Sequence, residues 1–279
     1  MTVAENIGLV ARIERWSADR IASRVAELLA LTGLPDDFAD RWPSEISGGQ
    51  QQRVGVARAL MMDPPILLMD EPFSAVDPVV REELQTEILR LQSELHKTIV
   101  FVTHDIDEAV KLGDKVAVFG RGGTLLQYAE PAFVLSNPAN ELVSAFVGAD
   151  RGYRGLQFFN ATGLRLHEVR HVAESELGGL TLGKDEWALV TKDDGTPFAW
   201  INAEGVEVHR NGSALYDSTV GGGSFFRPDG TLRLALDAAL SSPTGLGVAV
   251  GDDGQLLGGV KAEDVLALLA EQRRVPEVG

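Results

Sequence analysis

Hydrophobic residues recur at helical spacing in two segments near the start of the chain. Between Ala18 and Leu31 they stand three or four positions apart, which predicts an amphipathic helix. Residues 33–35, Gly-Leu-Pro, supply its end. A second helix is expected over residues 48–62, because Ser47 suits the N-cap position and the apolar residues that follow share one face.

Uninterrupted apolar runs follow these helices and predict strands. Residues 66–69 and 98–103 contain no alternating polar positions, so we expect both strands to be buried on both faces. Residues 78–95 have a helical period, residues 105–112 form a short helical pattern, and residues 115–119 predict a third strand. This alternation of strands and helices predicts an α/β fold with a parallel sheet.

The pattern loosens near residue 150, which divides the chain into expected domains of residues 1–150 and 151–279. In the second domain, residues 187–191 and 198–201 predict two strands joined by an Asp-Asp-Gly turn. Residues 231–270 follow with the order helix, strand, strand, helix. We therefore expect a smaller α+β domain after the first one.

The composition excludes several classes of function. The 279 residues contain 25 Lys and Arg against 41 Asp and Glu, a net charge of −16 with no basic stripe, which argues against a nucleic-acid partner. The absence of cysteine excludes disulfide frameworks, thiolate zinc sites and cysteine nucleophiles. Neither a run of about 20 apolar residues nor a signal-peptide pattern occurs, so we expect a cytoplasmic location.

Candidate chemistry lies at the ends of the two predicted strands. Asp70 and Glu71 follow the first strand, where one carboxylate can hold Mg²⁺ through water and the other can activate a water molecule. His104 follows the second strand and could contact a developing phosphate oxygen. Each of these features alone is also typical of an ordinary turn. Their specificity depends on a third feature, the glycine-rich N-terminus of the helix after Ser47, which favours anions.

Four segments in a fixed order carry a family resemblance. The chain contains Ser-Gly-Gly-Gln at 47–50, Ile-Leu-Leu-Met-Asp-Glu-Pro at 66–72, Ser-Ala-Val-Asp at 74–77 and Thr-His-Asp at 103–105. Together they resemble the ATP-binding-cassette (ABC) ATPases over roughly the first half of the chain. The resemblance implies part of a P-loop NTPase domain with a helical subdomain. It also implies a signature motif made of Ser47, Gly48, Gly49 and Gln50.

The same resemblance implies roles for the residues at the strand ends. Asp70 would hold Mg²⁺ through water, Glu71 would be the general base, and His104 would be the switch histidine. Asp77 would end the D-loop. The implied cofactors are ATP and Mg²⁺, and the implied assembly is a head-to-tail dimer in which one subunit's signature motif closes over ATP held by the other.

Finer features narrow the resemblance to one branch of the family. Residues 2–7, 47–60, 97–109 and 137–140 are similar to the ATPase subunits of importers for quaternary-ammonium osmoprotectants such as glycine betaine, choline and carnitine. An importer of another solute, such as an amino acid, is the alternative within the family. The implied partners are transmembrane permease subunits and, indirectly, an extracytoplasmic solute-binding protein, with the chain on the inner face of the membrane.

ATPase subunits of this kind often end in paired CBS modules. Residues 229–269 resemble one CBS half, and residues 164–208 would be a degenerate partner. Asp264 matches the position of the ribose-binding Asp in nucleotide-binding modules, whereas Lys261 stands where a hydroxyl residue is expected. Regulatory nucleotide binding is therefore in doubt.

The phosphate-binding loop of the family is missing from its expected place. ABC ATPases grip ATP with Gly-x-x-x-x-Gly-Lys-Ser/Thr, and no such motif precedes residue 47. We expect a front truncation that leaves apolar surface uncovered beside the strands and prevents ATP hydrolysis by the chain alone. The alternative is a non-catalytic module that lends its signature motif to an intact partner. Residues 178–184 match the spacing, but Asp185 and a predicted strand follow them, which favours a surface turn.

One motif predicts a different class of protein. His167-Glu168-x-x-His171 matches the zinc-binding pattern of metallopeptidases, with Glu174 or Glu186 as a conceivable third ligand. That chemistry requires both histidines on one helix, and the surrounding residues predict no clear long helix. The zinc metallopeptidase stays a remote alternative at this stage.

Overall fold

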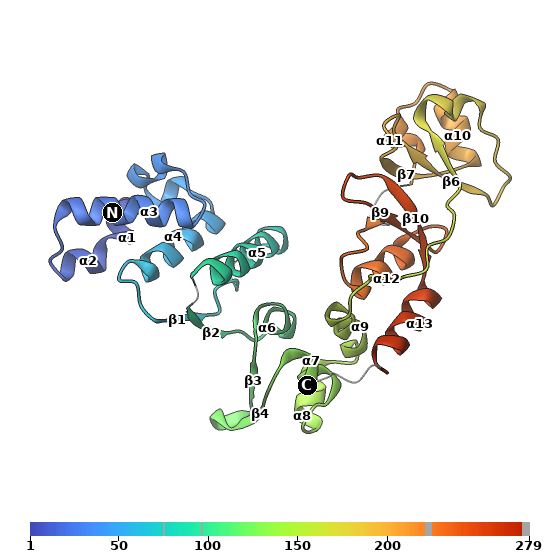
Figure 1. Ribbon diagram of the computed structural model, residues 1–279. Helices are drawn as coiled ribbons and strands as arrows, with labels where there is room; N and C mark the ends of the chain where they lie inside the picture. The colour runs from blue at the N-terminus through green and yellow to red at the C-terminus, as the bar shows by residue number, and fades with distance from the viewer. Residues whose placement is uncertain (75, 96, 221–224, 275–279) are drawn as a thin grey trace. The chain divides into compact units, whose positions relative to one another are not determined.

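The computed structural model describes residues 1–74, 76–95, 97–220 and 225–274. The chain divides into two compact units, Met1–Val147 and Gly148–Gly279, each with its own hydrophobic cores (Figure 1). Helices and strands occur in both units, so the expected mixed α/β class is confirmed. Within the described residues, no helix is both long enough and apolar enough to span a membrane.

Helices make up the first part of the N-terminal unit. They are α1 (Val3–Ile7), α2 (Leu9–Ile13), α3 (Ala18–Leu31) and α4 (Gly48–Leu60), with 3-10 turns η1 (Asp36–Asp40) and η2 (Pro43–Glu45) between α3 and α4. The predicted bounds of α3 are confirmed, since Ser17 caps it and its buried residues Val25, Leu28 and Leu29 share one face. These side chains pack against α1 and α4 in one core.

Two parallel strands follow, connected through a long helix. They are β1 (Ile66–Asp70) and β2 (Thr98–Val102), with α5 (Pro78–Leu95) between them, and the register places Leu68 beside Val100 and Asp70 beside Val102. One side of this small sheet is covered, because Met69 and Phe101 pack on the core formed with α5 and α6 (Ile106–Leu112). The parallel pairing predicted from the strand–helix–strand order is therefore confirmed for these two strands.

The expectation that both strands are buried on both faces is wrong. On the second side of the sheet Ile66 is 58% exposed and Leu68 is 71% exposed, and Val100 and Val102 are also open to solvent. The reason is that no other element of the described residues covers this side, although parallel sheets are normally covered on both. The uncovered apolar surface expected beside these strands is present.

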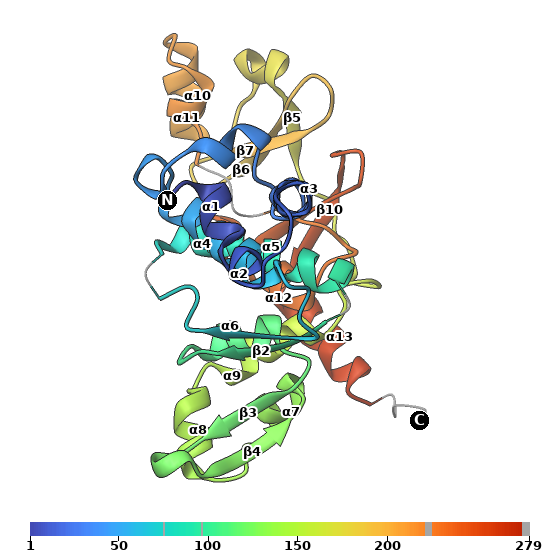
Figure 2. The same ribbon diagram turned by 90° about the vertical axis from the view of Figure 1, so that its left-hand side faces the viewer.

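The third predicted strand belongs to a different sheet. β3 (Val116–Phe119) pairs antiparallel with β4 (Leu125–Ala129), which the sequence does not predict, and both lie beside α7 (Pro131–Ser136) and α8 (Glu141–Val147) (Figure 2). Gly122 and Gly123 adopt φ of 71° and 77° and turn the chain back at once. This tight turn makes a hairpin and excludes β3 from the β1–β2 sheet.

The C-terminal unit contains two three-stranded sheets with the same topology. It opens with α9 (Arg151–Gly155) and the turn η4 (Leu156–Phe158). The first half then has β5 (His171–Ala173), η5 (Glu174–Gly179), β6 (Trp187–Thr191), β7 (Pro197–Asn202), α10 (Ala203–Arg210) and α11 (Leu215–Ser218). The second half has β8 (Phe225–Phe226), α12 (Leu232–Ser241), β9 (Leu246–Val250), β10 (Leu256–Lys261) and α13 (Ala262–Gln272). In each half a parallel pair is followed by an antiparallel hairpin and a helix.

Sequence and contacts both relate the two halves. Each hairpin turns at Asp-Asp-Gly, ending in Gly195 and Gly254, and the Gln255 amide donates to the Asp194 carbonyl oxygen at 2.8 Å. Trp200 on β7 and Val248 on β9 share one buried cluster, so the halves pack through a common core. The predicted strands, turns and helices of this unit are confirmed, and the structure adds that the two halves repeat one order of elements, as the resemblance to paired modules implied.

Candidate functional site

The backbone holds Glu71 in an unusual conformation at the carboxyl end of β1. Its φ of 41° lies in the left-handed region, which costs a non-glycine residue about 1 kcal/mol or more. The Glu71 N–H donates to the Val102 carbonyl oxygen at 2.8 Å, and the Ser74 hydroxyl donates to the Glu71 carbonyl oxygen at 3.0 Å. These bonds fix the residue between the two strands, with its side chain at the sheet edge.

His104 lies against Glu71 at this edge. Its Nδ1 is 3.1 Å from Glu71 Oε1, and the side chains are 73% and 46% exposed. The two residues are 33 positions apart, but β1 and β2 are parallel neighbours and both end here. Asp70 is exposed beside them, and its carboxylate has no hydrogen-bond or ion-pair partner among the described residues.

A small polar cavity lies behind the Glu71–His104 pair. It encloses about 60 Å³, enough for water, and is lined by Glu71, Phe73, Ser74, Arg81, Thr103, His104, Asp105 and Glu108. Arg81 and Glu108 are absent from the sequence-derived site. An acidic residue in the first turn of a helix is explained by the helix dipole, so no pattern marks Glu108; only the packing shows that it is buried.

Asp77 is held by hydrogen bonds to the backbone at the start of α5. Its Oδ1 accepts hydrogen bonds from the N–H groups of Val79 at 3.2 Å and Val80 at 3.1 Å, which caps the start of α5. Its expected neighbour in the D-loop, Ala75, lies outside the described residues. Asp77 therefore fixes where α5 begins, in the segment that follows Glu71 along the chain.

The residues of the predicted signature motif form the N-terminus of α4. Ser47 Oγ accepts a hydrogen bond from the Gln50 N–H at 3.3 Å, and Gln50 Oε1 accepts one from the Ser47 N–H at 2.9 Å, which is a capping box. Gly49 packs on α5, since a Cβ there would lie 2.7 Å from Val80 Cγ1, whereas Gly48 faces open space. Within the described part of the chain, no hydrogen bond or ion pair joins this motif to Glu71 or His104.

The cap predicts a measurable contribution to stability. Ser47→Ala removes the acceptor of the Gln50 N–H, so we expect the free energy of unfolding to fall by about 1 kcal/mol in urea titrations. Ser47→Thr keeps the hydroxyl and serves as the control. Equal losses for both variants would contradict a capping role.

The zinc-type motif at residues 167–171 and the glycine-rich segment 178–184 do not form the sites that their spacing suggests. His167 and His171 lie on extended backbone; His167 Nε2 is 2.8 Å from Asp264 Oδ2, and His171 Nδ1 is 3.0 Å from the Val169 carbonyl oxygen. No cluster of three or more metal-ligating side chains occurs among the described residues, and Glu186 binds Arg170 instead. The zinc alternative thus has no support from the geometry.

The glycine-rich segment 178–184 is a surface turn, as expected. It runs out of η5 and is followed by β6, which begins at Trp187. A phosphate-binding loop needs a helix N-terminus after its lysine, and none follows Lys184.

Asp264, at the position expected to bind a ribose, instead forms hydrogen bonds with His167 and with the Lys261 N–H. Burial has the largest single effect and favours the neutral acid, but hydrogen bonds from His167 and from the Lys261 N–H together hold the pKa of Asp264 below its ordinary value. The carboxylate also forms the capping box of α13. It therefore joins the start of the C-terminal unit to its last helix.

This pair predicts a pH-dependent stability. A lowered pKa contributes stability that is fully present above the unfolded value of about 4 and is lost as the pH falls through the folded value. We expect Asp264→Asn to destabilise the chain near neutral pH, with the difference from the original chain shrinking in acid. Urea titrations across the acid range measure it, with the neighbouring exposed Glu263→Gln as control. A difference independent of pH would contradict the prediction.

Comparisons with known proteins show the family of the chain. Residues 1–74 match the family described as ABC transporter. The chain is 39% identical to the osmoprotectant import ATP-binding protein OsmV of Salmonella typhimurium over 281 residues, covering 98% of this chain and 72% of that protein. It is 50% identical to the carnitine transport ATP-binding protein OpuCA of Listeria monocytogenes over 151 residues, covering 54% of this chain and only 38% of that protein.

Among solved structures, CbiO1 of Clostridium perfringens, part of the ABC transporter complex CbiONQ, matches with a TM-score of 0.45 and 30% identity, over 50% of this chain and 54% of that chain. The likeness to OsmV spans nearly the whole chain at 39% identity. The chain therefore belongs to the family of ABC transporter ATP-binding subunits.

Proposed function

We propose that the chain is the ATP-hydrolysing subunit of an ABC importer for quaternary-ammonium osmoprotectants. The observation that carries the proposal is the Glu71–His104 contact at the shared end of two parallel strands. The relatives named for osmoprotectant and carnitine transport support the class of solute. An amino-acid importer remains the alternative within the family.

In this proposal the residues at the sheet edge divide the chemistry between them. The Glu71 carboxylate accepts a proton from the attacking water, and His104 holds that carboxylate in place through Nδ1. Asp70 fits a Mg²⁺ role, because its exposed carboxylate has no other partner among the described residues. Bound Mg²⁺–ATP would supply the phosphoryl group and the charge neutralisation.

The signature motif acts on a second nucleotide site. Its helix N-terminus is unconnected to Glu71 within the described residues, and Gly48 leaves room for close approach of an anion. This arrangement supports a head-to-tail pair of ATP-binding subunits, each closing over ATP on the other. The sequence contains no Gly-x-x-x-x-Gly-Lys-Ser/Thr motif, so this proposal needs a phosphate grip that these residues do not supply.

That last point favours a second candidate function. The chain would be a non-catalytic module that lends Ser47, Gly48, Gly49 and Gln50 to an intact partner without holding ATP itself. The two functions differ in one respect: only the first requires Glu71.

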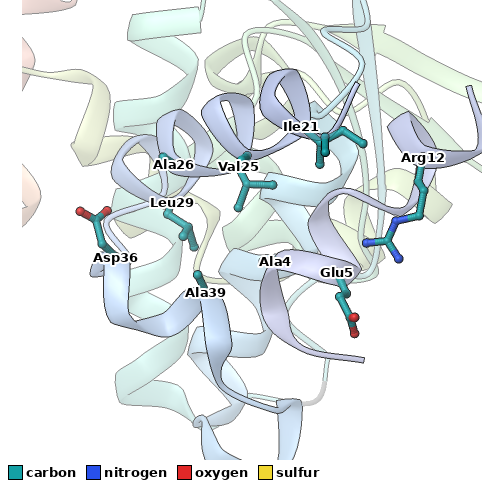
Figure 3. Close-up of a pocket in the computed structure, with 11 residues that line it drawn as sticks. Ala4, Glu5, Arg12, Ile21, Val25, Ala26, Leu29, Asp36 and Ala39 are labelled. Atoms are coloured by element: carbon teal, nitrogen blue, oxygen red, sulfur yellow. The ribbon is translucent and has the colours of Figure 1, made fainter. Parts of the chain in front are cut away.

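A pocket in the helical part of the N-terminal unit suits the permease. It encloses about 390 Å³ between α3 and the residues around α1 and η1 (Figure 3). Small side chains such as Ala4, Ala26 and Ala39 line it from α1, α3 and η1, and Asp36 lies at one end with Arg12 at the other. Alanines allow a helix backbone to approach closely. We propose that this pocket receives a cytoplasmic loop of the transmembrane subunit; in this proposal the chain lies on the inner face of the membrane.

The C-terminal unit is proposed to be a regulatory pair of CBS-like modules. Its repeated order of parallel pair, hairpin and helix supports this assignment. Asp264 is bound to His167, and Gly205 in the corresponding place of the first half lies against the Ser218 carbonyl oxygen. Neither half therefore offers a free carboxylate to a ribose at this position.

Reconstitution tests the proposal. We expect the chain, combined with its permease and a partner carrying an intact phosphate loop, to drive ATP-dependent uptake of glycine betaine, choline or carnitine. ATP titrations should show binding by the assembly and none by the chain alone, a result that both functions share, so the turnover of Glu71→Gln decides between them. Uptake of an amino acid instead would favour the alternative importer. ATP binding by the chain alone that is lost in Lys184→Ala would overturn the assignment of the phosphate grip.

A further inference from the structure

The contact between His104 and Glu71 cannot hold itself in place. Both side chains are largely open to solvent, at 73% and 46% exposure, and an exposed pair of this kind contributes little free energy against the entropy of two side chains. The position of the imidazole must therefore be imposed by the turn that carries it. That turn is made of Thr103, His104 and Asp105, between β2 and α6.

A partly buried hydrogen bond fixes this turn immediately before His104. Thr103 Oγ1 donates to Glu108 Oε2 at 2.6 Å and accepts the Asp105 N–H at 2.9 Å. Glu108 is 6% exposed, and a buried carboxylate is tolerated only where it finds hydrogen-bond partners. The short hydrogen bond from Thr103 supplies one.

The residue after His104 is held as well. Asp105 Oδ1 accepts the Asp107 N–H at 2.8 Å and caps α6, the helix that carries Glu108. His104 is therefore the exposed residue in the middle of a three-residue turn. Thr103 before it and Asp105 after it both form hydrogen bonds with α6. The backbone on both sides of His104 is thus held, which sets the direction in which its side chain leaves the turn.

An arginine lines the same cavity as Glu108. Arg81 lines the cavity together with Glu108 and Glu71. Its Nη2 donates to the Val76 carbonyl oxygen at 3.1 Å, whereas its buried Nε has no hydrogen-bond partner among the described residues. A guanidinium at this place offsets part of the cost of burying the carboxylate.

We propose that Glu108 is a positioning residue for the catalytic pair: acting through Thr103, it holds His104 against Glu71. Its consequence for turnover rests on the proposed ATPase function. The geometric claim does not, because the contact can be observed without ATP.

The test is a histidine NMR spectrum of the full chain labelled with ¹⁵N in its five histidines. The His104 ring signals are assigned from His104→Gln, and Glu71→Ala defines their position when the contact is lost. We expect Thr103→Val and Glu108→Leu to move the His104 signals to the Glu71→Ala position. Thr103→Ser and Glu108→Gln keep an oxygen at each end and should leave the signals where they are in the original chain.

Three results would overturn the proposal. One is an unchanged His104 spectrum in Thr103→Val, which preserves shape and removes only the hydroxyl. The second is an equal displacement in Glu108→Gln and Glu108→Leu. The third is additivity in the Thr103→Val, Glu108→Leu double variant, because two groups acting through one bond should displace the signals no further than either alone. If Glu108→Leu does not fold, the Thr103 pair of variants decides.

The spectrum also separates this inference from the proposed function. Normal turnover in Glu71→Gln, together with the expected NMR shifts, would refute the ATPase role of Glu71 and leave the positioning role of Glu108 standing. Lowered turnover in Glu71→Gln, together with His104 signals that do not move in Thr103→Val, would refute the positioning role of Glu108 alone.

Discussion

Replacing Glu71 by Gln will lower ATP turnover by the assembled transporter by about 10²- to 10⁴-fold, the range that a general base contributes. The amide keeps the shape and an oxygen toward His104, so the contact at 3.1 Å and the fold should persist. What is lost is the capacity to accept a proton from water. Initial rates of phosphate release, compared at saturating ATP, measure the effect.

A matched variant controls for the charge change. Glu83→Gln alters an exposed carboxylate on α5 and should leave turnover unchanged. Turnover in Glu71→Gln at the rate of the original assembly would mean that the hydrolytic base lies in the partner. That outcome would select the non-catalytic module over the ATPase.

The second large effect concerns the core between the two halves of the C-terminal unit. Trp200 is 2% exposed and packs with Val169, Leu189 and Val248. We expect Trp200→Ala to lower the free energy of unfolding by about 3–5 kcal/mol, because it removes a large buried ring and leaves a cavity. Urea unfolding followed by far-UV circular dichroism measures the loss without relying on tryptophan fluorescence.

Trp200→Phe separates ring packing from hydrogen bonding. The indole Nε1 is buried and has no hydrogen-bond partner among the described residues, so removing it breaks no bond. We expect this variant to lose about 1 kcal/mol, as is typical of substitutions that keep most of the buried ring. Trp42→Ala, at a 53% exposed position, should cost far less than Trp200→Ala. Equal losses for Trp200→Phe and Trp200→Ala would show that the ring does not fill this core.

Local elements and the family could be predicted from the order of the residues alone. The bounds of α3, the cap at Ser47 and the Asp-Asp-Gly hairpins depend on residues within a few positions of one another. Helical period, capping chemistry and turn residues report such short-range interactions directly. The order of the four motifs indicated the ABC family, which the likeness to OsmV confirms.

Features that depend on contacts between distant residues became visible only in the folded structure. Burial of β1 and β2 depends on which elements cover each side, and the apolar runs that predict full burial are the same whether a side is covered or open. β3 joined a hairpin because two glycines turn the chain at once. Asp264 is not free for a ribose because it forms a hydrogen bond with His167, 97 positions away in the sequence. Glu108 became part of the site because folding buries it against Thr103, and no local pattern distinguishes a buried first-turn carboxylate from a solvated one.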